Sequence, residues 1–446
     1  MVDAVSVLAG SSATAEDEPR HLPPPVWALL VLPFGLAVGF ATIAIPYVMR
    51  ERGVDVPTIA SVSAISSLPH FLKLFWAPAL DSGPKRKHWY FAMVATTAAT
   101  LAVTALVPPD PNAHLGPFSL LTIFTALLFV AQAAVATSSS AVLALVAVTV
   151  PLRKQGRTSG WQTVGNLFGT SVGGALVTYL IAHMAPITTA IVVATLCCVS
   201  AIPAFFIVEE PLPKRPLGKL LVDLLRDLWK TVKSYDGWTG LVICLSPVGT
   251  GALSELFSAV AKEYAADEQT RENMVVLVNG VMGGIMSAAG ALLGGYVSDR
   301  IHRRVAYALF GGFTALAAIG MMLGPATPTT FTLGCLAYSF ANGLCYAAFY
   351  AFVFEMVGKE AGVTTKLALF VGASNLAINY VKWLDGLGYG AGEKLWPGQA
   401  WGGRVGMLGM DALASFVGIA LLSVMVVWVR RRKARDAVKG DAAPAQ

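Results

Sequence analysis

Long apolar runs recur along the whole chain and predict its architecture. A membrane-spanning helix needs about 20 predominantly apolar residues, and twelve runs reach that length. The runs lack the alternation of apolar and polar positions that marks the strands of an outer-membrane barrel, so they predict helices. The predicted spans cover residues 26–49, 57–80, 89–108, 118–146, 158–182, 186–208, 237–261, 273–297, 305–325, 329–356, 365–388 and 406–429.

A segment of different character separates the sixth and seventh spans. In residues 209–236, leucines recur at helical spacing with charged residues between them, which is typical of an amphipathic helix. These leucines are Leu217, Leu220, Leu221, Leu224, Leu225 and Leu228. We expect a helix that lies on the inner membrane surface and links two halves of six spans each.

The composition agrees with a membrane protein. Hydrophobic residues make up 55% of the 446 residues and charged residues only 13%, against about 25% charged in an average soluble protein. So few charges exclude an ordinary cytosolic enzyme and a disordered chain. The five cysteines lie inside apolar runs without the spacing of a metal site, and no basic block is interleaved with aromatic residues. We therefore expect no metal, no cofactor and no nucleic-acid partner.

The basic residues predict the orientation in the membrane. If both termini are inside, the inner segments hold most of the 32 Lys and Arg residues, as the positive-inside rule requires. The chain is then an all-α integral protein of the cell (inner) membrane, with twelve transmembrane helices in two six-helix bundles. The expected segments are a flexible cytoplasmic tail (1–25), an N-terminal bundle (26–208), the amphipathic linker (209–236), a C-terminal bundle (237–429) and a basic cytoplasmic tail (430–446).

The two halves carry matching inner loops. After the second span and after the eighth, a small residue precedes an Asp by four positions, and two cations follow that Asp by four and five positions. The residues are Ala77, Asp81, Lys85 and Arg86 in the first loop, and Gly295, Asp299, Arg303 and Arg304 in the second. Repeated halves are the organisation of a secondary transporter, whose site lies between the repeats.

The second loop, GGYVSDRIHRR, resembles the signature loop of the major facilitator superfamily, with His302 where the pattern has Gly. The first loop departs further, with Ala77 in place of the Gly and Ser82 in place of the cation after the Asp. This resemblance implies two pseudo-symmetric bundles, alternating access and a proton gradient as the driving force.

A shorter stretch resembles one branch of that superfamily. LPHFLKLFWAPALDS (68–82), preceded by ERGVDVPTIA (51–60), is similar to the muropeptide permeases and acetyl-CoA transporters. The residues that carry this similarity are Pro69, Lys73, Trp76, Pro78 and Asp81.

The loop charges have two interpretations. An Asp at the inner end of a span can accept hydrogen bonds from a neighbouring helix N-terminus, and the loop cations can pair with carboxylates in a state closed to the inside. We expect a gate of this kind, with Glu355 as a partner for the second loop. Its residues are Asp81, Arg86, Asp299, Arg303, Arg304 and Glu355. The alternative is that these charges only determine the topology.

Lys73 and His70 lie one helical turn apart within the second span. Lys73 precedes Asp81 by eight residues and so lies about 12 Å into the membrane at roughly 1.5 Å per residue. A charge there is costly, so we expect Lys73 to meet an anionic substrate group, and His70 to contact substrate. A structural ion pair for Lys73 and a structural role for His70 stay open.

Glu255 lies in the seventh span, where Pro247, Gly249 and Gly251 predict a kink or unwound stretch. Interrupted helices often mark transporter sites, so Glu255 is the expected proton-coupling carboxylate. The alternative is a residue at the outer interface.

Further polar residues fall within the other spans. Lys382 and Asp385 are three residues apart and predict a structural ion pair that Asp411 could join. Uncharged residues could contact substrate or form interhelical hydrogen bonds. Those that we expect at the substrate site are Gln132, Gln162, Asn166, Asn279, Asn342, Tyr346 and Asn375.

No Walker A, HExxH or GxSxG motif occurs, which argues against an enzyme. We expect a monomeric secondary active transporter of a small organic solute, anionic or amphiphilic, coupled to protons. A sensor or lipid flippase on the same scaffold, and a membrane-embedded enzyme of lipid or glycan metabolism, remain as alternatives.

Overall fold

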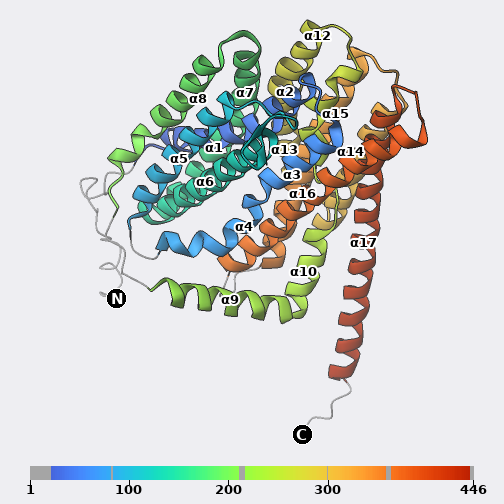
Figure 1. Ribbon diagram of the computed structural model, residues 1–446. Helices are drawn as coiled ribbons and strands as arrows, with labels where there is room; N and C mark the ends of the chain where they lie inside the picture. Colours follow the sequence, from blue (N-terminus) through green and yellow to red (C-terminus); the bar gives the residue numbers. More distant parts are fainter. Residues whose placement is uncertain (1–21, 82–83, 210–215, 299, 358–362, 442–446) are drawn as a thin grey trace, which may run out of the picture.

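The computed structural model describes residues 22–81, 84–209, 216–298, 300–357 and 363–441 (Figure 1). Within these ranges the chain is helical almost throughout. A two-stranded antiparallel hairpin, β1 (His114–Leu115) and β2 (Phe118–Ser119), lies in the connection between the third and fourth spans. The all-α membrane fold predicted from the sequence is confirmed.

The first six spans are built from eight α-helices and three short η segments. Their bounds are α1 (Val26–Gly39), η1 (Phe40–Ala44) and α2 (Ile45–Glu51) for the first span; α3 (Val56–Ser67), α4 (Pro69–Trp76) and η2 (Ala77–Asp81) for the second; then α5 (Arg86–Leu106), α6 (Leu120–Thr149), α7 (Leu152–His183), and α8 (Pro186–Ala201) with η3 (Ile202–Phe206).

The last six spans follow the linker helix α9 (Leu217–Lys233). Their bounds are α10 (Tyr235–Leu245), η4 (Ala252–Glu255), α11 (Phe257–Val260) and the short η5 (Ala261–Glu263); α12 (Glu268–Asn273), η6 (Met274–Met282) and α13 (Gly283–Ser298); then α14 (Arg303–Leu323), α15 (Pro328–Val357), α16 (Val363–Leu395) and α17 (Gly402–Asp441).

In the described ranges, nine helical stretches are long and apolar enough to cross a membrane. The remaining predicted spans are the second, seventh and eleventh. The second is divided between α3 and α4, the seventh is interrupted after α10, and the eleventh, α16, carries several polar and charged side chains. The three spans that depart from a simple apolar helix are therefore those that hold Lys73, Glu255 and Lys382.

The interruption of the seventh span has a local chemical cause. Pro247 has no backbone N–H to donate, and Gly249 and Gly251 adopt φ values of 51° and 75°, which a residue with a Cβ adopts only at a cost. A Cβ on Gly251 would also lie 2.5 Å from the Asn342 amide of α15. The unwound stretch predicted from these residues is thus present, and it places Glu255 in η4.

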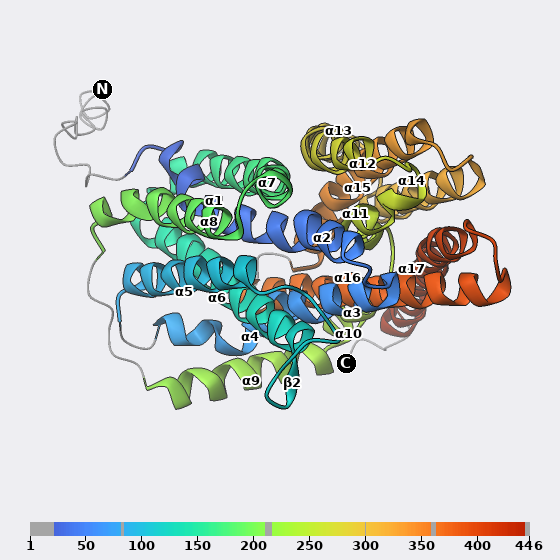
Figure 2. The ribbon, with the colours of Figure 1, turned by 45° about the horizontal axis from the view of Figure 1, so that its top comes forward.

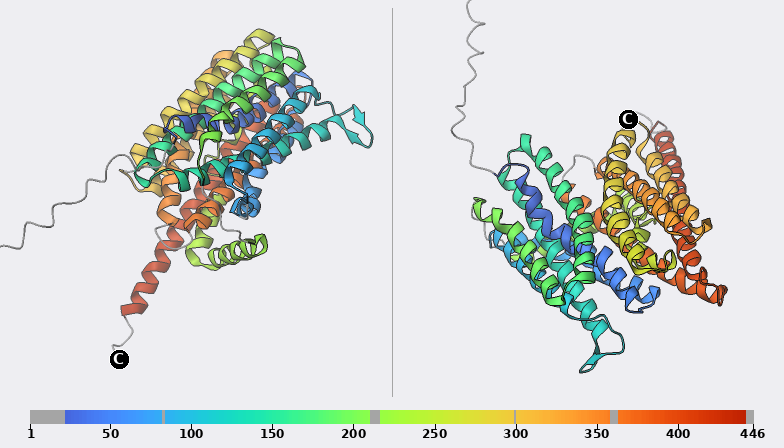
Figure 3. Two further views of the ribbon diagram at one scale, coloured as in Figure 1. Left: turned by 90° about the vertical axis from the view of Figure 1, so that its left-hand side faces the viewer. Right: turned by 90° about the horizontal axis from the view of Figure 1, so that it is seen from above.

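The helices form two groups that lie side by side (Figures 2 and 3). In the first group α5 packs on α6 and α8, and in the second α14 packs on α15 and α17. The third span thus contacts the fourth and sixth, as the ninth contacts the tenth and twelfth. This repetition is the pseudo-symmetry that the matching loops predict.

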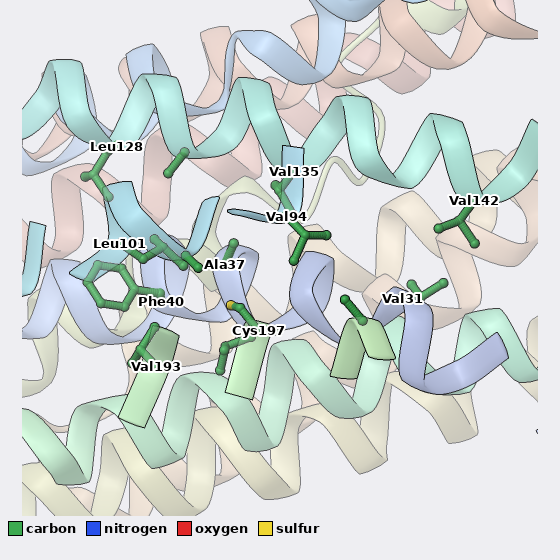
Figure 4. Packing of buried hydrophobic residues seen from close by; sticks show 14 of the residues in the cluster. Val31, Ala37, Phe40, Val94, Leu101, Leu128, Val135, Val142, Val193 and Cys197 are labelled. Atoms are coloured by element: carbon green, nitrogen blue, oxygen red, sulfur yellow. The ribbon is translucent and has the colours of Figure 1, made fainter. Parts of the chain in front are cut away.

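Each group has its own apolar core. In the first, Phe40 of η1 and Leu101 of α5 pack near Val193 and Cys197 of α8, and all four are buried (Figure 4). Large apolar side chains on the outside, such as Leu292 and Leu323, are 79% and 77% exposed. An apolar exterior of this kind suits a lipid environment.

The halves are joined most extensively by two pairs of spans, α3 with α16 and α7 with η6, and α2 also contacts α11. On the side from which the last turns of α17 project, α9 runs across the molecule (Figure 1). Its Leu228 is buried with Leu74 of α4 and Leu369 of α16. The linker helix therefore contacts both halves at one end of the molecule, which we call the α9 side.

Candidate functional site

A connected polar group lies where the second span meets the eleventh. His70 Nε2 and Gln132 Oε1 are 2.9 Å apart, and Gln132 Nε2 donates to the Ala37 carbonyl at 2.9 Å. Asn375 Nδ2 donates to the His70 carbonyl at 3.4 Å. The group thus links α1, α4 and α6 of the first half with α16 of the second, and it unites three of the predicted substrate-binding residues.

Lys73 lies one turn beyond His70 on α4. Within the part of the chain that the structure describes, its ammonium group has no hydrogen-bonding or ionic partner. Lys73 and Lys382 are both within electrostatic reach of the His70 ring. Positive charge therefore gathers between the two halves, and Lys73 has no carboxylate among the described residues to compensate it.

Lys382 pairs with Glu255. The Lys382 ammonium donates to Glu255 Oε2 at 2.5 Å and to Ser67 Oγ at 2.9 Å. Because Ser67 ends α3 of the first half, this lysine joins the unwound seventh span, the eleventh span and the second. The Lys382 side chain is 1% exposed and that of Glu255 is 22% exposed.

The prediction that Lys382 pairs with Asp385 is wrong, because Lys382 pairs with Glu255 instead. Both carboxylate oxygens of Asp385 are buried without a hydrogen bond. Asp411 accepts hydrogen bonds from the Tyr338 hydroxyl at 3.1 and 3.2 Å. A lysine side chain can reach several helices in a bundle, and the unwinding at Gly251 brings Glu255 closer to Lys382 than sequence spacing indicates.

The other predicted polar residues lie outside the His70 group. Asn279 Nδ2 donates to Ser258 Oγ at 3.0 Å, and the Cys335 thiol donates to Asn279 Oδ1 at 3.6 Å. These are interhelical bonds inside the second half, the alternative considered for such residues. Asn342 packs against Gly251, and its Oδ1 is buried without a partner.

Three more of these residues lie on α7 and α15. Gln162 is buried with its Nε2 atom unpaired, and Asn166 Oδ1 accepts from Thr170 at 3.4 Å. Tyr346 is 42% exposed, and its ring lies 6.0 Å from that of Tyr350. No hydrogen bond of the described residues joins them to His70, so their role at a substrate site stays a prediction.

The structure describes the basic residues of the predicted gate. The backbone N–H groups of Arg86 and Lys87 each donate to the Glu209 carboxylate at 3.1 Å, and the Arg86 guanidinium lies 3.6 Å from it. This carboxylate therefore caps the N-terminus of α5, where a negative charge is favourable. Arg303 donates to the Ala351 carbonyl on α15 at 3.1 Å.

The three acids of the gate remain predictions. Asp299 lies outside the described residues, as do the side chains of Asp81 and Glu355. Arg304 lies over the Phe352 ring, with its guanidinium carbon 5.8 Å from the ring centroid.

An ionic network at the other end of the molecule was not predicted. Arg271 of α12 binds Glu51 of α2 through two contacts, Nε to Oε1 at 2.8 Å and a terminal nitrogen to Oε2 at 3.1 Å. Such bidentate pairs are both strong and geometrically specific. The two residues are 220 positions apart in the sequence, and they join the first half to the second.

Further contacts join the halves beside this pair. Arg50 donates to the Tyr389 hydroxyl at 3.1 Å, and that hydroxyl donates to Glu263 at 2.6 Å. His183 of α7 lies 2.8 Å from Glu272. Among the described residues, every ion pair that joins the halves belongs to this network, which we call the latch. The latch consists of Arg50, Glu51, His183, Glu263, Arg271, Glu272 and Tyr389.

The latch shows which end of the interface is closed. It lies at the end of the molecule away from α9, where α2 and α12 meet (Figure 1). The sequence signal for the latch is a set of charged or titratable residues beside the ends of the first, fifth and seventh spans and before the eighth. Charges in such places are normally interpreted as topology determinants.

The chain matches a known protein family, and its fold is similar to solved structures of transporters. The family model of the Major Facilitator Superfamily matches residues 27–378. The structure is similar to a D-xylose–proton symporter (13% identity, TM-score 0.64, covering 90% of this chain and 96% of that one). It is also similar to a mutant form of the nucleoside transporter NupG (13%, 0.66, 90% and 98%).

A third similar structure is a POT family transporter in complex with 5-aminolevulinic acid (9% identity, TM-score 0.65, covering 92% of this chain and 96% of that one). At these identities the structural likeness shows the fold, and the family model carries the assignment. The match is to the superfamily as a whole, and the likeness of residues 68–82 to the muropeptide permease branch remains a prediction. The chain belongs to the major facilitator superfamily, and it is a transporter rather than an enzyme.

Proposed function

We propose that the chain is a proton-coupled transporter of a small organic anion, including amphiphilic anions, and that it works by alternating access. The observation that carries this proposal is Lys73, a cation within the second span that lacks an anionic partner among the described residues. A charge inside the membrane costs at least about 2.5 kcal/mol. A substrate carboxylate or phosphate would offset that cost when it binds.

The surroundings of Lys73 suit such a substrate. The His70–Gln132 pair and Asn375 supply donors and acceptors beside it. Lys382 adds a second positive charge within reach of His70. Because Glu255 balances Lys382, the excess positive charge of this site is that of Lys73. A site with an excess positive charge selects for anions, since an approaching cation would meet repulsion and leave the polar groups poorly paired.

The amphiphilic part of the proposed class has separate support. A groove of about 670 Å³ lies between α3 and α6, and its lining is mostly apolar. Its walls include Val62 and Ile65 of α3 and Phe129 and Val130 of α6. An acyl chain or apolar ring fits such a lining. Ile65 and Val130 are 46% and 44% exposed, so the groove opens to the outside of the helix bundle.

Glu255 is the proposed coupling carboxylate. Protonation of its side chain would remove the charge that pairs with Lys382. Lys382 would then be a buried cation without a counter-charge, which favours either rearrangement or binding of an anion. Proton binding and anion binding are thereby linked through one lysine that also contacts the first half at Ser67.

The latch supports alternating access. With the termini and α9 inside, as the basic residues predict, the latch closes the outer end of the interface. The described arrangement is then a state that is closed at its outer end. Transport requires a second state in which the latch is broken.

Uptake into proteoliposomes with an imposed proton gradient tests the proposal. Pools of anionic metabolites, some amphiphilic, are added while internal pH and solute are measured. For the pool that wild type accumulates, we expect Lys73→Ala to lower uptake at least about tenfold, the equivalent of 1.4 kcal/mol. Lys73→Arg should keep part of the uptake, since it keeps the charge.

Lys394→Ala is the matched control, because Lys394 lies on α16 and is exposed. This variant should transport like wild type. Undiminished anion uptake by Lys73→Ala would contradict the assigned site, and accumulation of neutral or cationic pools alone would contradict the substrate class.

A further inference from the structure

Two buried acids on adjacent helices of the second half interact electrostatically. Asp385 of α16 is 0% exposed and Asp411 of α17 is 1% exposed. The Tyr338 hydroxyl of α15 donates to both oxygens of Asp411. Asp385 Oδ1 and Oδ2 have no hydrogen-bond partner. A buried carboxylate without a donor is costly, so Asp385 requires a bound positive species.

No side chain of the described residues supplies that charge. Lys382 is one turn away on the same helix, but its ammonium is bound to Glu255 and Ser67. Asp411 is the charged group that acts on Asp385. Among the described residues, the titratable groups beside the pair are Tyr338, which both acids affect, and Lys382 and Tyr389, each about one turn from Asp385 on α16.

One bound proton would remove both the repulsion between the two carboxylates and the unpaired state of Asp385. Two carboxylates that share a buried site cannot both be ionised without strong repulsion. A proton on Asp385 removes one of the two charges and turns an unpaired acceptor into a hydrogen-bond donor. The Tyr338 hydroxyl stabilises the charge that remains on Asp411.

We propose that Asp385 and Asp411 form a binding site for one exchangeable proton, which the two carboxyl groups share. Binding changes the charge of the pair from −2 to −1, and the proton comes from water and returns to water. The site is distinct from Glu255 and from the polar group at Lys73. Its role in transport rests on the proposed proton coupling, whereas its occupancy by a proton does not.

The contact between the halves provides a route for exchange. Asp385 precedes Gly386, where α16 lies so close to α3 that a Cβ would be 2.5 Å from the Ala60 Cβ. This contact seals the interface beside the acids while the latch is closed. When the latch opens, α3 and α16 must separate, and water then gains access next to Asp385. The geometry therefore links proton exchange to the state of the transporter.

Infrared difference spectroscopy of the purified full-length protein in lipid nanodiscs tests the site without a substrate. Wild type should show the C=O stretching band of a protonated carboxylic acid that disappears as pH rises. In a Glu263→Gln background, where the Glu263 carboxyl of the latch no longer contributes, Asp385→Asn should remove this band. Asp223→Asn, in which an exposed α9 carboxylate is changed, should leave the band unchanged.

Tyr338→Phe gives a second measurement that does not alter either acid. It should keep the band but shift its frequency, because Asp411 loses the two hydrogen bonds from the tyrosine. If Asp385→Asn fails to fold, this shift still tests the site. A folded Asp385→Asn variant that keeps the whole band, or no response to Tyr338→Phe, would overturn the proposal. So would a band that disappears only when sodium is added, which would indicate a metal-cation site.

Transport assays then separate this inference from the proposed function. We expect Asp385→Asn to lower proton-driven accumulation about tenfold or more while solute exchange without a gradient stays within about twofold of wild type. Loss of both accumulation and exchange in this variant would assign Asp385 a structural role and overturn its coupling role. If wild type itself transports no anion, the proposed function fails, while the infrared bands still decide whether the proton site exists.

Discussion

At the residue scale, the pair of Glu255 and Lys382 is the most informative contact. The two side chains differ in burial, since Glu255 is 22% exposed and Lys382 only 1%. Water can therefore solvate the charge of an unpaired Glu255 carboxylate much better than that of an unpaired Lys382 ammonium group. Removing either partner leaves one uncompensated charge, but the cost depends on which one remains.

This asymmetry gives a prediction for stability. Glu255→Gln should cost up to about 3–5 kcal/mol, the range for a broken buried pair, because it leaves Lys382 buried and unpaired. Lys382→Met should cost less. The double variant should recover most of the loss, since no uncompensated charge remains. Thermal unfolding in detergent measures all three, and a larger loss for Lys382→Met than for Glu255→Gln would contradict the assignment of the buried partner.

At the element scale, the contact of α3 with α16 depends on small residues. A Cβ on Gly386 would lie 2.5 Å from the Ala60 Cβ and 3.3 Å from the Pro57 Cα. One turn along α16, a Cβ on Gly390 would meet only Pro57 Cγ, at an ordinary 3.4 Å. The two glycines face the same helix but differ sharply in the space beside them.

We therefore expect Gly386→Ala to separate α3 from α16 and to open the latch end, whereas Gly390→Ala should have little effect. Ala60→Gly removes the clashing atom, so the pair Gly386→Ala with Ala60→Gly should return to wild-type behaviour. The distance between spin labels at the latch ends of α2 and α12 reports the opening. Equal distances in the Gly386→Ala and Gly390→Ala variants would contradict the close contact.

At the scale of the whole molecule, the latch makes the conformational equilibrium sensitive to pH. Glu263 follows the seventh span, at the end of η5 on the latch side of the molecule. Burial raises the pKa of Glu263 from 4.5 to about 7, while the hydrogen bond from Tyr389 and the charges of Arg50 and Arg404 lower it and Glu393 raises it. In an open state the carboxyl would meet water, and its pKa would return toward 4.5.

The direction in which pH shifts the equilibrium follows from the difference in the pKa of Glu263 between the closed and the open state. The closed state has the higher pKa, so it binds the proton more tightly, and protonation favours closure. As pH rises from about 4.5 to about 7, the closed state loses this advantage and the open population should grow. The same label distance measured across that range tests the prediction.

Glu263→Gln should remove the pH dependence, because it keeps the size of the side chain but cannot ionise. His183→Gln serves as a control for the other titratable pair of the latch. Opening on acidification, instead of on raising the pH, would contradict the predicted sign.

Local sequence determined much of the fold. The helical spans follow from runs of apolar residues, because lipid requires every backbone group to be paired within its own segment. Pro247, Gly249 and Gly251 likewise predict the break in the seventh span, since their effect on the backbone is local. The matching loops and the family resemblance predicted two related halves, and Lys73 was marked as a candidate by its charge alone.

Only the tertiary structure determined which charged side chains pair with each other. Lys382 contacts Glu255, 127 positions away, rather than its neighbour Asp385, and Arg271 contacts Glu51 across 220 positions. Spacing along one helix limits such choices only weakly, because long side chains reach whichever helix packs alongside. Whether a charge inside the membrane is paired, shared or free for a ligand is therefore a property of the assembled helices. For that reason the sequence predicted where the charges are, and only the structure showed that Asp385 lacks a hydrogen-bond partner and that the latch is closed.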